Sequence, residues 1–299
     1  MSFSSQPGRN GRIQVGLIGS GIQASLSPAL HMREGAEQGL EYQYELFDLD
    51  RITGGTLALS SLLESAQARA FAGVNVTHPC KQTVLPLLDE LSDDARMLRA
   101  VNTVVFSNGR RIGHNTDWWG FAESFRRGLS GVSVNHVVQL GAGGAGAAVG
   151  YAMLKLGAGC LEVFDLDAGR MNALVTTLSE LFPSQRVQPV RDLRSSMSDA
   201  DGLVHATTTG MLKNPGLALP IELLAARHWV VEIVYFPLET ELLQAARAIG
   251  CRTLDGGGMA VFQAVDAFRL FTGISPDANR MARHFDVLAR RPSPLEAAD

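Results

Sequence analysis

The stretch Asn135-His-Val-Val-Gln-Leu-Gly-Ala-Gly-Gly-Ala-Gly146 decides how this chain is organised. Its valine-rich apolar run predicts a buried parallel strand, and a helix is expected from Ala145. Between them, Gly141, Gly143 and Gly146 have the G-x-G-x-x-G spacing. In that spacing Gly141 allows a tight turn, Gly143 lets a pyrophosphate approach the backbone, and Gly146 lets the helix pack closely on the strand. The amino terminus of the helix then offers N–H groups and a positive dipole end to phosphates.

A second predicted strand follows at Cys160-Leu-Glu-Val-Phe-Asp165 and ends in an acid 19 residues after Gly146. A carboxylate at this place accepts hydrogen bonds from both hydroxyls of an adenosine ribose. The alternative is an ordinary strand-helix-strand crossover that binds no ligand. Strand, glycine turn, helix, strand and acid together favour a Rossmann-type dinucleotide-binding domain.

The composition indicates a two-domain globular protein. The chain has 299 residues, of which 46% are hydrophobic and 19% charged, which is enough apolar material for two cores. A net charge of −4 does not favour a nucleic-acid or membrane surface. Three scattered cysteines without C-x-x-C spacing predict neither disulfides nor a metal site. The polar start has no apolar core typical of a secretory signal, so we expect a soluble, cytoplasmic protein.

The first domain is expected to start with a strand at Ile13–Gly19, followed by a loop and a helix that opens at Pro28. Two hydroxyls in that loop, Ser25 and Ser27, could hold a substrate carboxylate. Ser27 before Pro28 also matches a helix N-cap followed by a proline in the first turn. The sequence leaves these two interpretations open.

A short strand within Ala70–Lys81 turns into a helix at Pro79, which places Thr77 and Lys81 at the strand end. If this strand is parallel to the first, these side chains share an edge with the serines. Lys81 in the first helical turn meets the unfavourable end of the helix dipole, and a solvated lysine is the alternative to a functional one. Two strands are expected at Arg99–Phe106 and Arg111–Asn115, joined by a hairpin turn at Asn108-Gly109. Asp117 either caps the next helix or has a chemical role.

The remaining strands and helices alternate, with a helix expected at Ala168–Leu181 after the second strand, as is typical of a parallel sheet. We predict an α/β fold with two domains separated by a cleft: an N-terminal α/β substrate domain over 1–117, a Rossmann-type domain over 118–259, and C-terminal helices over 260–299 that return to the first domain.

Taken together, the loops resemble those of the shikimate and quinate/shikimate dehydrogenase family, in the family's order from about Gly16 to Leu288. The motifs are Ser25-Leu-Ser-Pro28, Asn75-Val-Thr-His-Pro-Cys-Lys81, Ala100-Val-Asn-Thr103, Gly113-His-Asn-Thr-Asp117, Gly141-Ala-Gly-Gly-Ala-Gly146 and Gly258-Met-x-x-x-Gln263.

The resemblance implies reversible hydride transfer between a nicotinamide cofactor and the C3 oxygen of a shikimate-like or quinate-like small molecule. It implies that Lys81 and Asp117 form the catalytic pair. The other implied residues are Ser25, Ser27 and Tyr235 for the carboxylate; Thr77, Asn102 and Gln263 for ring hydroxyls; and Gly144, Ala145, Thr207, Gly258 and Met259 for the cofactor.

The acid at Asp165 predicts NAD rather than NADP. Many relatives carry an arginine after the second strand that receives the 2′-phosphate of NADP, whereas a carboxylate repels that phosphate. Arg170 either stacks on adenine or supports some NADP binding. The loop His205-Ala-Thr-Thr-Thr-Gly-Met211 departs from the family pattern Asn-Ala-Thr-Pro-x-Gly-Met, and Glu232 stands where aspartate is common. We interpret His205 as a packed strand residue.

An aminoshikimate-type relative with a different natural substrate has the same motifs and is the main alternative. Functions of other classes are less consistent with the residues. A non-catalytic sensor need not retain both Lys81 and Asp117, and the paired serines disfavour a folate-linked dehydrogenase of related architecture. The sequence leaves monomer and homodimer open, as well as the direction of the reaction.

Overall fold

The computed structural model describes residues 12–290 and divides the chain into two compact units. The first unit runs up to Thr116 and resumes at Gln263, and the second extends from Asp117 to Phe262. The division lies one residue from the predicted boundary at the first crossing and three residues from it at the return. At the first crossing the boundary coincides with the start of a helix at Asp117. At the return, a helix runs without a break through Phe262 and belongs to both units, so neither side of the boundary has a loop there.

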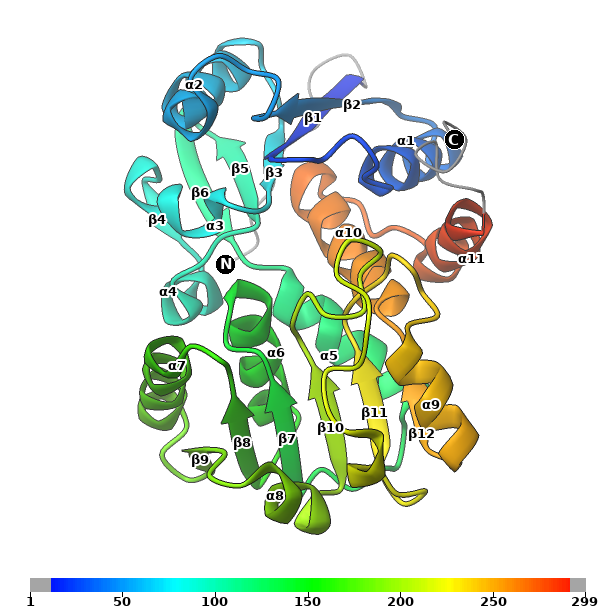
Figure 1. Ribbon diagram of the computed structural model, residues 1–299. Coiled ribbons are helices and arrows are strands. Elements are labelled where there is room, and N and C mark those ends of the chain that lie inside the picture. The colour runs from blue at the N-terminus through cyan, green and yellow to red at the C-terminus, as the bar shows by residue number, and fades with distance from the viewer. Residues whose placement is uncertain (1–11, 291–299) are drawn as a thin grey trace. The chain divides into compact units, whose positions relative to one another are not determined.

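The first unit contains a mixed six-stranded sheet in the order β2-β1-β3-β5-β6-β4 (Figure 1). Its strands are β1 (Arg12–Gly19), β2 (Glu41–Asp48), β3 (Gly73–Val76), β4 (Glu90–Leu91), β5 (Thr103–Ser107) and β6 (Arg110–His114). Its helices are α1 (Ser27–Glu37), α2 (Leu59–Ala68), α3 (Cys80–Thr83), α4 (Asp93–Leu98), α11 (Ala278–Ala289), part of α10 (Gly257–Thr272) and the short 3-10 helices η1 (Gly55–Ala58) and η2 (Leu85–Leu87).

Strand direction confirms the predicted placement of two loops in this unit. β1 is parallel to β3, and Ile18 pairs with Val76 at their carboxyl ends. The loop that carries the serines and the loop that carries Thr77 therefore leave the sheet at the same edge. Both faces of the sheet are covered, one by a core that includes Leu63 and Val74, the other by a core that includes Val15 and Phe268.

The second unit contains a parallel six-stranded sheet in the order β12-β11-β10-β7-β8-β9. Its strands are β7 (His136–Leu140), β8 (Cys160–Phe164), β9 (Arg186–Pro189), β10 (Gly202–His205), β11 (Trp229–Glu232) and β12 (Arg252–Leu254). Its helices are α5 (Asp117–Gly128), α6 (Gly144–Lys155), α7 (Ala168–Leu181), α8 (Leu193–Asp199), α9 (Glu241–Ile249), the first turns of α10 and the 3-10 helix η3 (Ile221–Leu223).

The strand order of the second unit reverses between β7 and β10. Loops at the carboxyl ends of such neighbouring strands form the usual binding crevice of an open parallel sheet. The glycine loop follows β7, and the loop that starts at Thr207 follows β10. The predicted Rossmann-type order is thus confirmed, and it brings these two loops to one edge of the sheet.

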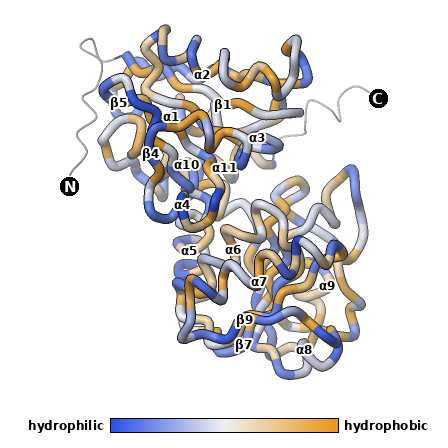
Figure 2. Tube along the Cα trace, turned by 90° about the vertical axis from the view of Figure 1, so that its left-hand side faces the viewer, coloured by the Kyte–Doolittle hydropathy of each residue, from blue (hydrophilic) through white to orange (hydrophobic). Residues whose placement is uncertain are grey.

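The hydropathy of the chain agrees with these layers. Hydrophobic and hydrophilic residues alternate along the trace in each unit (Figure 2), as expected for elements that are buried on one side. Within residues 12–290 every helix is too short or too polar to span a lipid bilayer.

Some element predictions are wrong. The helix expected from Pro79 lasts one turn and ends at Thr83, because Pro86 and the residue before it cannot continue it. Because this helix has a single turn, Lys81 is as close to its carboxyl end as to its amino end. The predicted unfavourable interaction of Lys81 with the helix dipole is therefore absent. The strand expected from Arg99 starts only at Thr103, since Arg99 ends α4 with a φ of 49°.

Candidate active site

In the first unit, the site is built around the loop that follows β1. Asp48, at the end of β2 and 4% exposed, accepts hydrogen bonds from the Gly21 backbone at 3.1 Å and the Gln23 side chain at 2.9 Å. Burial alone would raise the pKa of this carboxyl group, but the hydrogen bonds outweigh it and the net pKa is lowered. The charged form of Asp48 thus holds the loop that carries Ser25 and Ser27.

The N-cap interpretation of Ser27 is wrong. The cap position is Leu26, which makes no side-chain cap bond, and Ser27 is already helical. Its backbone N–H donates to Oγ of Ser25 at 3.3 Å, and its hydroxyl hydrogen-bonds the phenol of Tyr44. Burial raises the pKa of Tyr44, and the bond from Ser27 offsets this only in part. Tyr44 therefore stays neutral and able to donate.

From Tyr44 a polar network continues through the sheet. The Tyr44 hydroxyl donates to Oδ1 of Asn75 at 2.8 Å, and the Asn75 amide donates to Oγ1 of Thr103 at 3.0 Å. The Thr103 hydroxyl donates to Oδ1 of Asn102 at 3.1 Å. The Asn102 amide NH2 group donates to the Thr116 hydroxyl at 2.9 Å, and Oδ1 of Asn102 accepts from the Thr116 backbone N–H at 2.8 Å.

This network connects two groups of predicted site residues. It starts at Ser27, passes through Asn102 (4% exposed) and ends at Thr116, the residue before Asp117 in the chain. The Ser27–Asn102 connection depends on Tyr44, Asn75 and Thr103, which were not predicted as site residues. Only the register of β2, β3 and β5 brings them into line.

The other predicted substrate residues of this unit lie at the same sheet edge or on its helices. Thr77 follows β3, and its backbone N–H donates to the Ile18 carbonyl at 2.9 Å. Gly19 accommodates this approach, since a Cβ there would lie 2.3 Å from Cγ2 of Thr77. Lys81 is on α3 and accepts a backbone bond from Val101 at 2.8 Å. Gln263 lies on α10.

In the second unit, the glycine loop has the geometry that the sequence predicts. Gly141 has a φ of 104°, and a Cβ on it would lie 2.4 Å from the Ala206 carbonyl oxygen. A Cβ on Gly146 would lie 2.3 Å from the Gly141 carbonyl oxygen. The tight turn and the close helix packing are therefore confirmed. At Gly143 and Gly144 a Cβ would meet no atom within 4 Å apart from those of its chain neighbours and of its own helix, so the backbone is open to a ligand there.

A buried glutamine on the preceding strand holds this loop in place; it was not predicted as a site residue. Gln139 is fully buried on β7, and its amide donates to the carbonyl oxygens of Gly141 at 2.8 Å and of Gly146 at 2.9 Å. It thereby ties the start of the loop to the first turns of α6. The residues present fit a dinucleotide: an open glycine backbone, a helix amino terminus and an acid at the next strand end.

That acid is Asp165, directly after β8. Its carboxylate accepts hydrogen bonds from the backbone of Ala142 and of Asp167, both at 2.8 Å. Arg170 lies 3.4 Å from Asp165 and 3.2 Å from Asp167, so its guanidinium pairs with both carboxylates. Three charged groups therefore meet beside the glycine loop with a net charge of −1.

The departures from the family pattern form one buried cluster. His205 is 1% exposed and Glu232 fully buried, and Nδ1 of His205 donates to the Glu232 carboxylate at 2.8 Å. On the other side of the ring, Nε2 lies 2.5 Å from Oγ1 of Thr207, which also accepts from the Thr209 backbone at 3.1 Å. His205 is thus a packed strand residue, as predicted, and it positions Thr207.

Four further predicted residues lie in this unit. Asp117 is 2% exposed at the start of α5. Desolvation raises the pKa of Tyr235, and the charge of Asp117 raises it further, so the phenol and this carboxylate lie within electrostatic range. Gly258 packs against α5, where a Cβ would meet the Ser124 hydroxyl at 2.1 Å, and Met259 follows it on α10.

Comparison with known proteins agrees with this geometry. Residues 17–104 match the family model described as the shikimate dehydrogenase substrate binding domain. The chain is 57% identical to a shikimate dehydrogenase (NADP(+)) of Streptomyces avermitilis, over 92% of this chain and 95% of the relative. It is 48% identical to a quinate/shikimate dehydrogenase (NAD(+)) of Corynebacterium efficiens, over 91% and 97%.

Among solved structures, a quinate dehydrogenase from Corynebacterium glutamicum in complex with NAD is similar, with a TM-score of 0.88 and 46% identity. The match covers 92% of this chain and 99% of that one. The fold, the glycine loop and the sequence identity point the same way, and the chain belongs to the shikimate dehydrogenase family of NAD(P)-dependent oxidoreductases.

Proposed function

We propose that this chain catalyses the reversible oxidation of shikimate at its C3 hydroxyl to 3-dehydroshikimate, with NAD as the cofactor and quinate as a further substrate. The observation that carries the proposal is the network from Ser27 through Tyr44, Asn75 and Thr103 to Asn102. Fixed hydroxyls and amides of this kind suit a small ring that has both a carboxylate and several hydroxyls.

Within this proposal, Ser25 and Ser27 bind the substrate carboxylate together with Tyr235. Thr77, Asn102 and Gln263 bind ring hydroxyls. The bond from Ser27 to Tyr44 supports the first role, because a serine already held by a neutral phenol is oriented before the substrate arrives.

Lys81 and Asp117 are proposed to act at the reacting hydroxyl. A nicotinamide dinucleotide, which the glycine loop and Asp165 would hold, would supply the hydride transfer at C3. In the reduction direction, the ammonium group of Lys81 donates a hydrogen bond and then its proton to the ketone oxygen. Asp117 accepts a hydrogen bond from that ammonium group and orients it. Both roles rest on the resemblance and on the chemistry of the two groups.

For the cofactor, we propose NAD over NADP. Relatives named for NADP(+) and relatives named for NAD(+) are both similar to this chain. The charge around Asp165 favours NAD. Asp165 and Asp167 outnumber Arg170, and the guanidinium is already paired with both of them. A 2′-phosphate with nearly two negative charges is repelled by such a group, whereas ribose hydroxyls can donate to Asp165.

Steady-state kinetics test the proposal. The absorbance of the reduced cofactor is followed with shikimate, quinate or aminoshikimate, each with NAD and with NADP. We expect the highest kcat/KM for shikimate with NAD and measurable turnover of quinate. Higher kcat/KM with NADP would contradict the cofactor assignment, and higher kcat/KM with aminoshikimate would contradict the substrate assignment. Binding without turnover of any substrate would identify a sensor instead.

The catalytic pair is tested by substitution. Because general acid-base catalysis contributes about 10²- to 10⁴-fold, Lys81→Ala should lower kcat by a factor in this range with little change in substrate affinity. Asp117→Asn should lower kcat similarly and also weaken substrate binding. Lys155→Ala, at the end of α6 remote from the glycine loop, is the matched control. Turnover of Lys81→Ala at the rate of the unmodified protein would remove Lys81 from the mechanism.

A further inference from the structure

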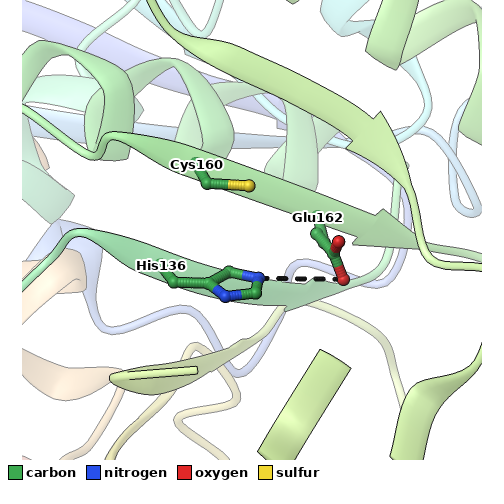
Figure 3. A group of neighbouring side chains, drawn as sticks. All are labelled: His136, Cys160 and Glu162. Carbon is green, nitrogen blue, oxygen red and sulfur yellow. Dashed lines mark ion pairs between the residues drawn. The ribbon is translucent and has the colours of Figure 1, made fainter. Parts of the chain in front are cut away.

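Three side chains with metal-binding atoms gather at the amino ends of β7 and β8. His136, the first residue of β7, pairs in register with Cys160, the first residue of β8. Glu162 lies two residues further along β8 and therefore points to the same face as Cys160. The imidazole nitrogen, the thiol sulfur and a carboxylate oxygen all lie within 4.8 Å of one another (Figure 3).

Two of these atoms are buried without a hydrogen-bond partner among residues 12–290: Nε2 of His136 and Oε2 of Glu162. Glu162 is 8% exposed, and only its other oxygen is bonded, by the amide of Gln188. Leaving buried polar atoms unpaired is costly, so such atoms require an explanation.

The two atoms without a hydrogen bond among the described residues face each other at a distance that a direct hydrogen bond does not explain (Figure 3). They are 3.8 Å apart, too far for a hydrogen bond between a protonated imidazole and a carboxylate. Two ligands that each lie about 2.0–2.1 Å from the same zinc ion are about 3.3–3.4 Å apart in tetrahedral geometry. The two atoms would therefore need to approach each other by about 0.4–0.5 Å, a small side-chain movement, to share one metal ion.

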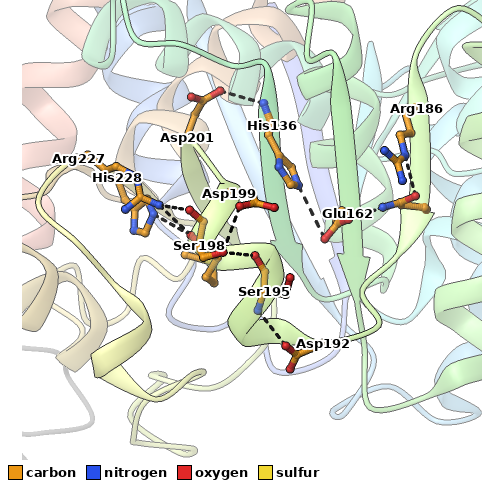
Figure 4. A network of polar contacts seen from close by, with 12 residues as sticks. His136, Glu162, Arg186, Asp192, Ser195, Ser198, Asp199, Asp201, Arg227 and His228 are labelled. Carbon is orange, nitrogen blue, oxygen red and sulfur yellow. Dashed lines mark hydrogen bonds and ion pairs between the residues drawn. The ribbon is translucent and has the colours of Figure 1, made fainter.

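The surrounding residues hold the proposed ligands in place. Arg186 donates to Oε1 of Gln188 at 2.8 Å, and the Gln188 amide donates to Glu162, so a chain of side chains fixes the carboxylate (Figure 4). The His136 backbone N–H donates to Asp201 at 2.9 Å, which fixes the start of β7. Partners of this kind orient ligands in metal sites.

We propose that His136, Cys160 and Glu162 bind one Zn²⁺ ion, with water as the fourth ligand. A nitrogen, a thiolate sulfur and a carboxylate oxygen form a donor set that zinc accepts in tetrahedral geometry. The thiol of Cys160 releases its proton to solvent when the metal binds. The site lies at the end of β7 opposite to the glycine loop, so it ties β7 to β8 and stabilises the second unit without contributing to hydride transfer.

The sequence predicted no metal site because the ligands are 24 and 26 residues apart along the chain, without a zinc-binding spacing. Only the parallel register of β7 and β8 makes them neighbours.

The test is metal binding by the full-length protein after treatment with a chelator. Zn²⁺ is titrated by calorimetry, and Co²⁺ is used as a spectroscopic probe for thiolate coordination. We expect one Zn²⁺ per chain, a Co²⁺-thiolate absorption band, and a Tm that rises with the Zn²⁺ concentration.

Cys160→Ser should abolish the thiolate band. Since even a change next to a ligand costs about 10- to 100-fold in metal affinity, loss of the ligand should cost at least as much. His136→Asn and Glu162→Gln should weaken Zn²⁺ binding similarly. Cys251→Ser is the matched control: it is a buried thiol of the same unit that donates to the Ala225 carbonyl at 3.3 Å.

The variants should fold, as judged by circular dichroism, and Cys160→Ser should keep the NAD-dependent activity of the unmodified protein. The proposal is overturned if the unmodified protein does not bind Zn²⁺. It is also overturned if Cys160→Ser retains the band and the affinity, because the metal would then be bound elsewhere.

Discussion

At the residue scale, Gln139 shows how one buried side chain can shape a binding loop. Its amide bonds two loop carbonyls, and each such bond contributes roughly 0.5–1.5 kcal/mol. Gln139→Met has similar volume but leaves both carbonyls without this donor. We expect the KM for NAD to rise about tenfold, equivalent to about 1.4 kcal/mol, with a smaller change in the KM for shikimate. Initial-rate kinetics check this, with the exposed Gln244→Met as control. An unchanged KM for NAD would mean that the loop keeps its form without Gln139.

Asp165 is the residue on which cofactor choice depends. Asp165→Asn removes the charge, and its side-chain oxygen can still accept from Ala142. With one carboxylate fewer beside Arg170, the ratio of kcat/KM for NADP to that for NAD should rise about tenfold or more, equivalent to at least about 1.4 kcal/mol. Asp167→Asn, at an exposed position that still suits an N-cap, should shift this ratio less. Equal shifts in the two variants would assign the effect to net charge in general.

Sequence reasoning identified the residues with local signals and missed those that depend on register. The glycine spacing and the acid at Asp165 are periodic features of one strand-helix-strand unit, so they can be recognised in a linear sequence. Tyr44 and Asn75 are 31 positions apart in the sequence. They meet only because β2 and β3 both pair with β1, one on each side of it. The Ser27 hydroxyl faces Tyr44 instead of capping α1, which no local pattern reveals.

At the scale of elements, long periodic segments were predicted well and short ones poorly. The predicted bounds of the 14-residue helix α7 (Ala168–Leu181) coincide with the structure. By contrast, α4 and α8 were not predicted, because helices of six and seven residues are shorter than the window in which a helical period is visible. Their start signals are nevertheless present, since Ser92 and Asp192 cap them with side-chain bonds.

The His205–Glu232 pair connects two neighbouring strands, so its effect belongs to β10, β11 and the loop after β10. In His205→Asn, the asparagine side chain is too short to contact both Glu232 and Thr207. We expect a loss of about 1–3 kcal/mol of stability and a several-fold higher KM for NAD. Urea unfolding of His205→Asn, Glu232→Asp and the double variant gives the coupling between the two positions, expected at about 0.5–3 kcal/mol. Combining His205→Asn with the exposed Glu241→Asp is the control, and its effects should add. Additive effects for the pair itself would show that the two side chains act independently.

At the scale of the whole chain, the first unit is assembled from residues that are far apart in sequence. Glu34 on α1 binds the amino end of α11 through three bonds: from Nη2 of Arg280 at 2.6 Å, from Nε of Arg280 at 2.8 Å and from the Asp277 backbone at 2.9 Å. The two helices are thus joined over 246 positions of sequence. Because Glu34 is 1% exposed, its charge is stabilised mainly by these donors.

This contact makes the docking of α11 dependent on pH. Burial would raise the pKa of Glu34, but the hydrogen bonds from Arg280, Gln38 and Asp277 outweigh it, so the pKa is lowered from 4.5. A carboxyl group with a lowered pKa in the folded state contributes stability that is fully present above pH 4.5 and is lost as the pH falls through the lowered value. Glu34→Gln lacks this titration. Its amide NH2 group cannot accept a hydrogen bond, so one of the donors is left unsatisfied, and α11 docking at pH 7 should weaken by about 1–3 kcal/mol.

Amide hydrogen exchange of α11 measures this docking locally, without requiring both units to unfold together. At neutral pH, exchange in Glu34→Gln should be about tenfold faster than in the unmodified protein, equivalent to about 1.4 kcal/mol. The difference should shrink as the pH is lowered below 4.5, because the unmodified protein then loses the same interaction. Glu37→Gln is the control: it removes the exposed pair with Arg33 and a weaker charge interaction with Arg280, but leaves the hydrogen bonds of Glu34 intact. In this variant, amide exchange in α11 should stay close to that of the unmodified protein at neutral and at acidic pH. A difference that persists undiminished in acid would show that the neutral glutamine disturbs the packing of α11 and that the charge of Glu34 is not what holds this helix in place.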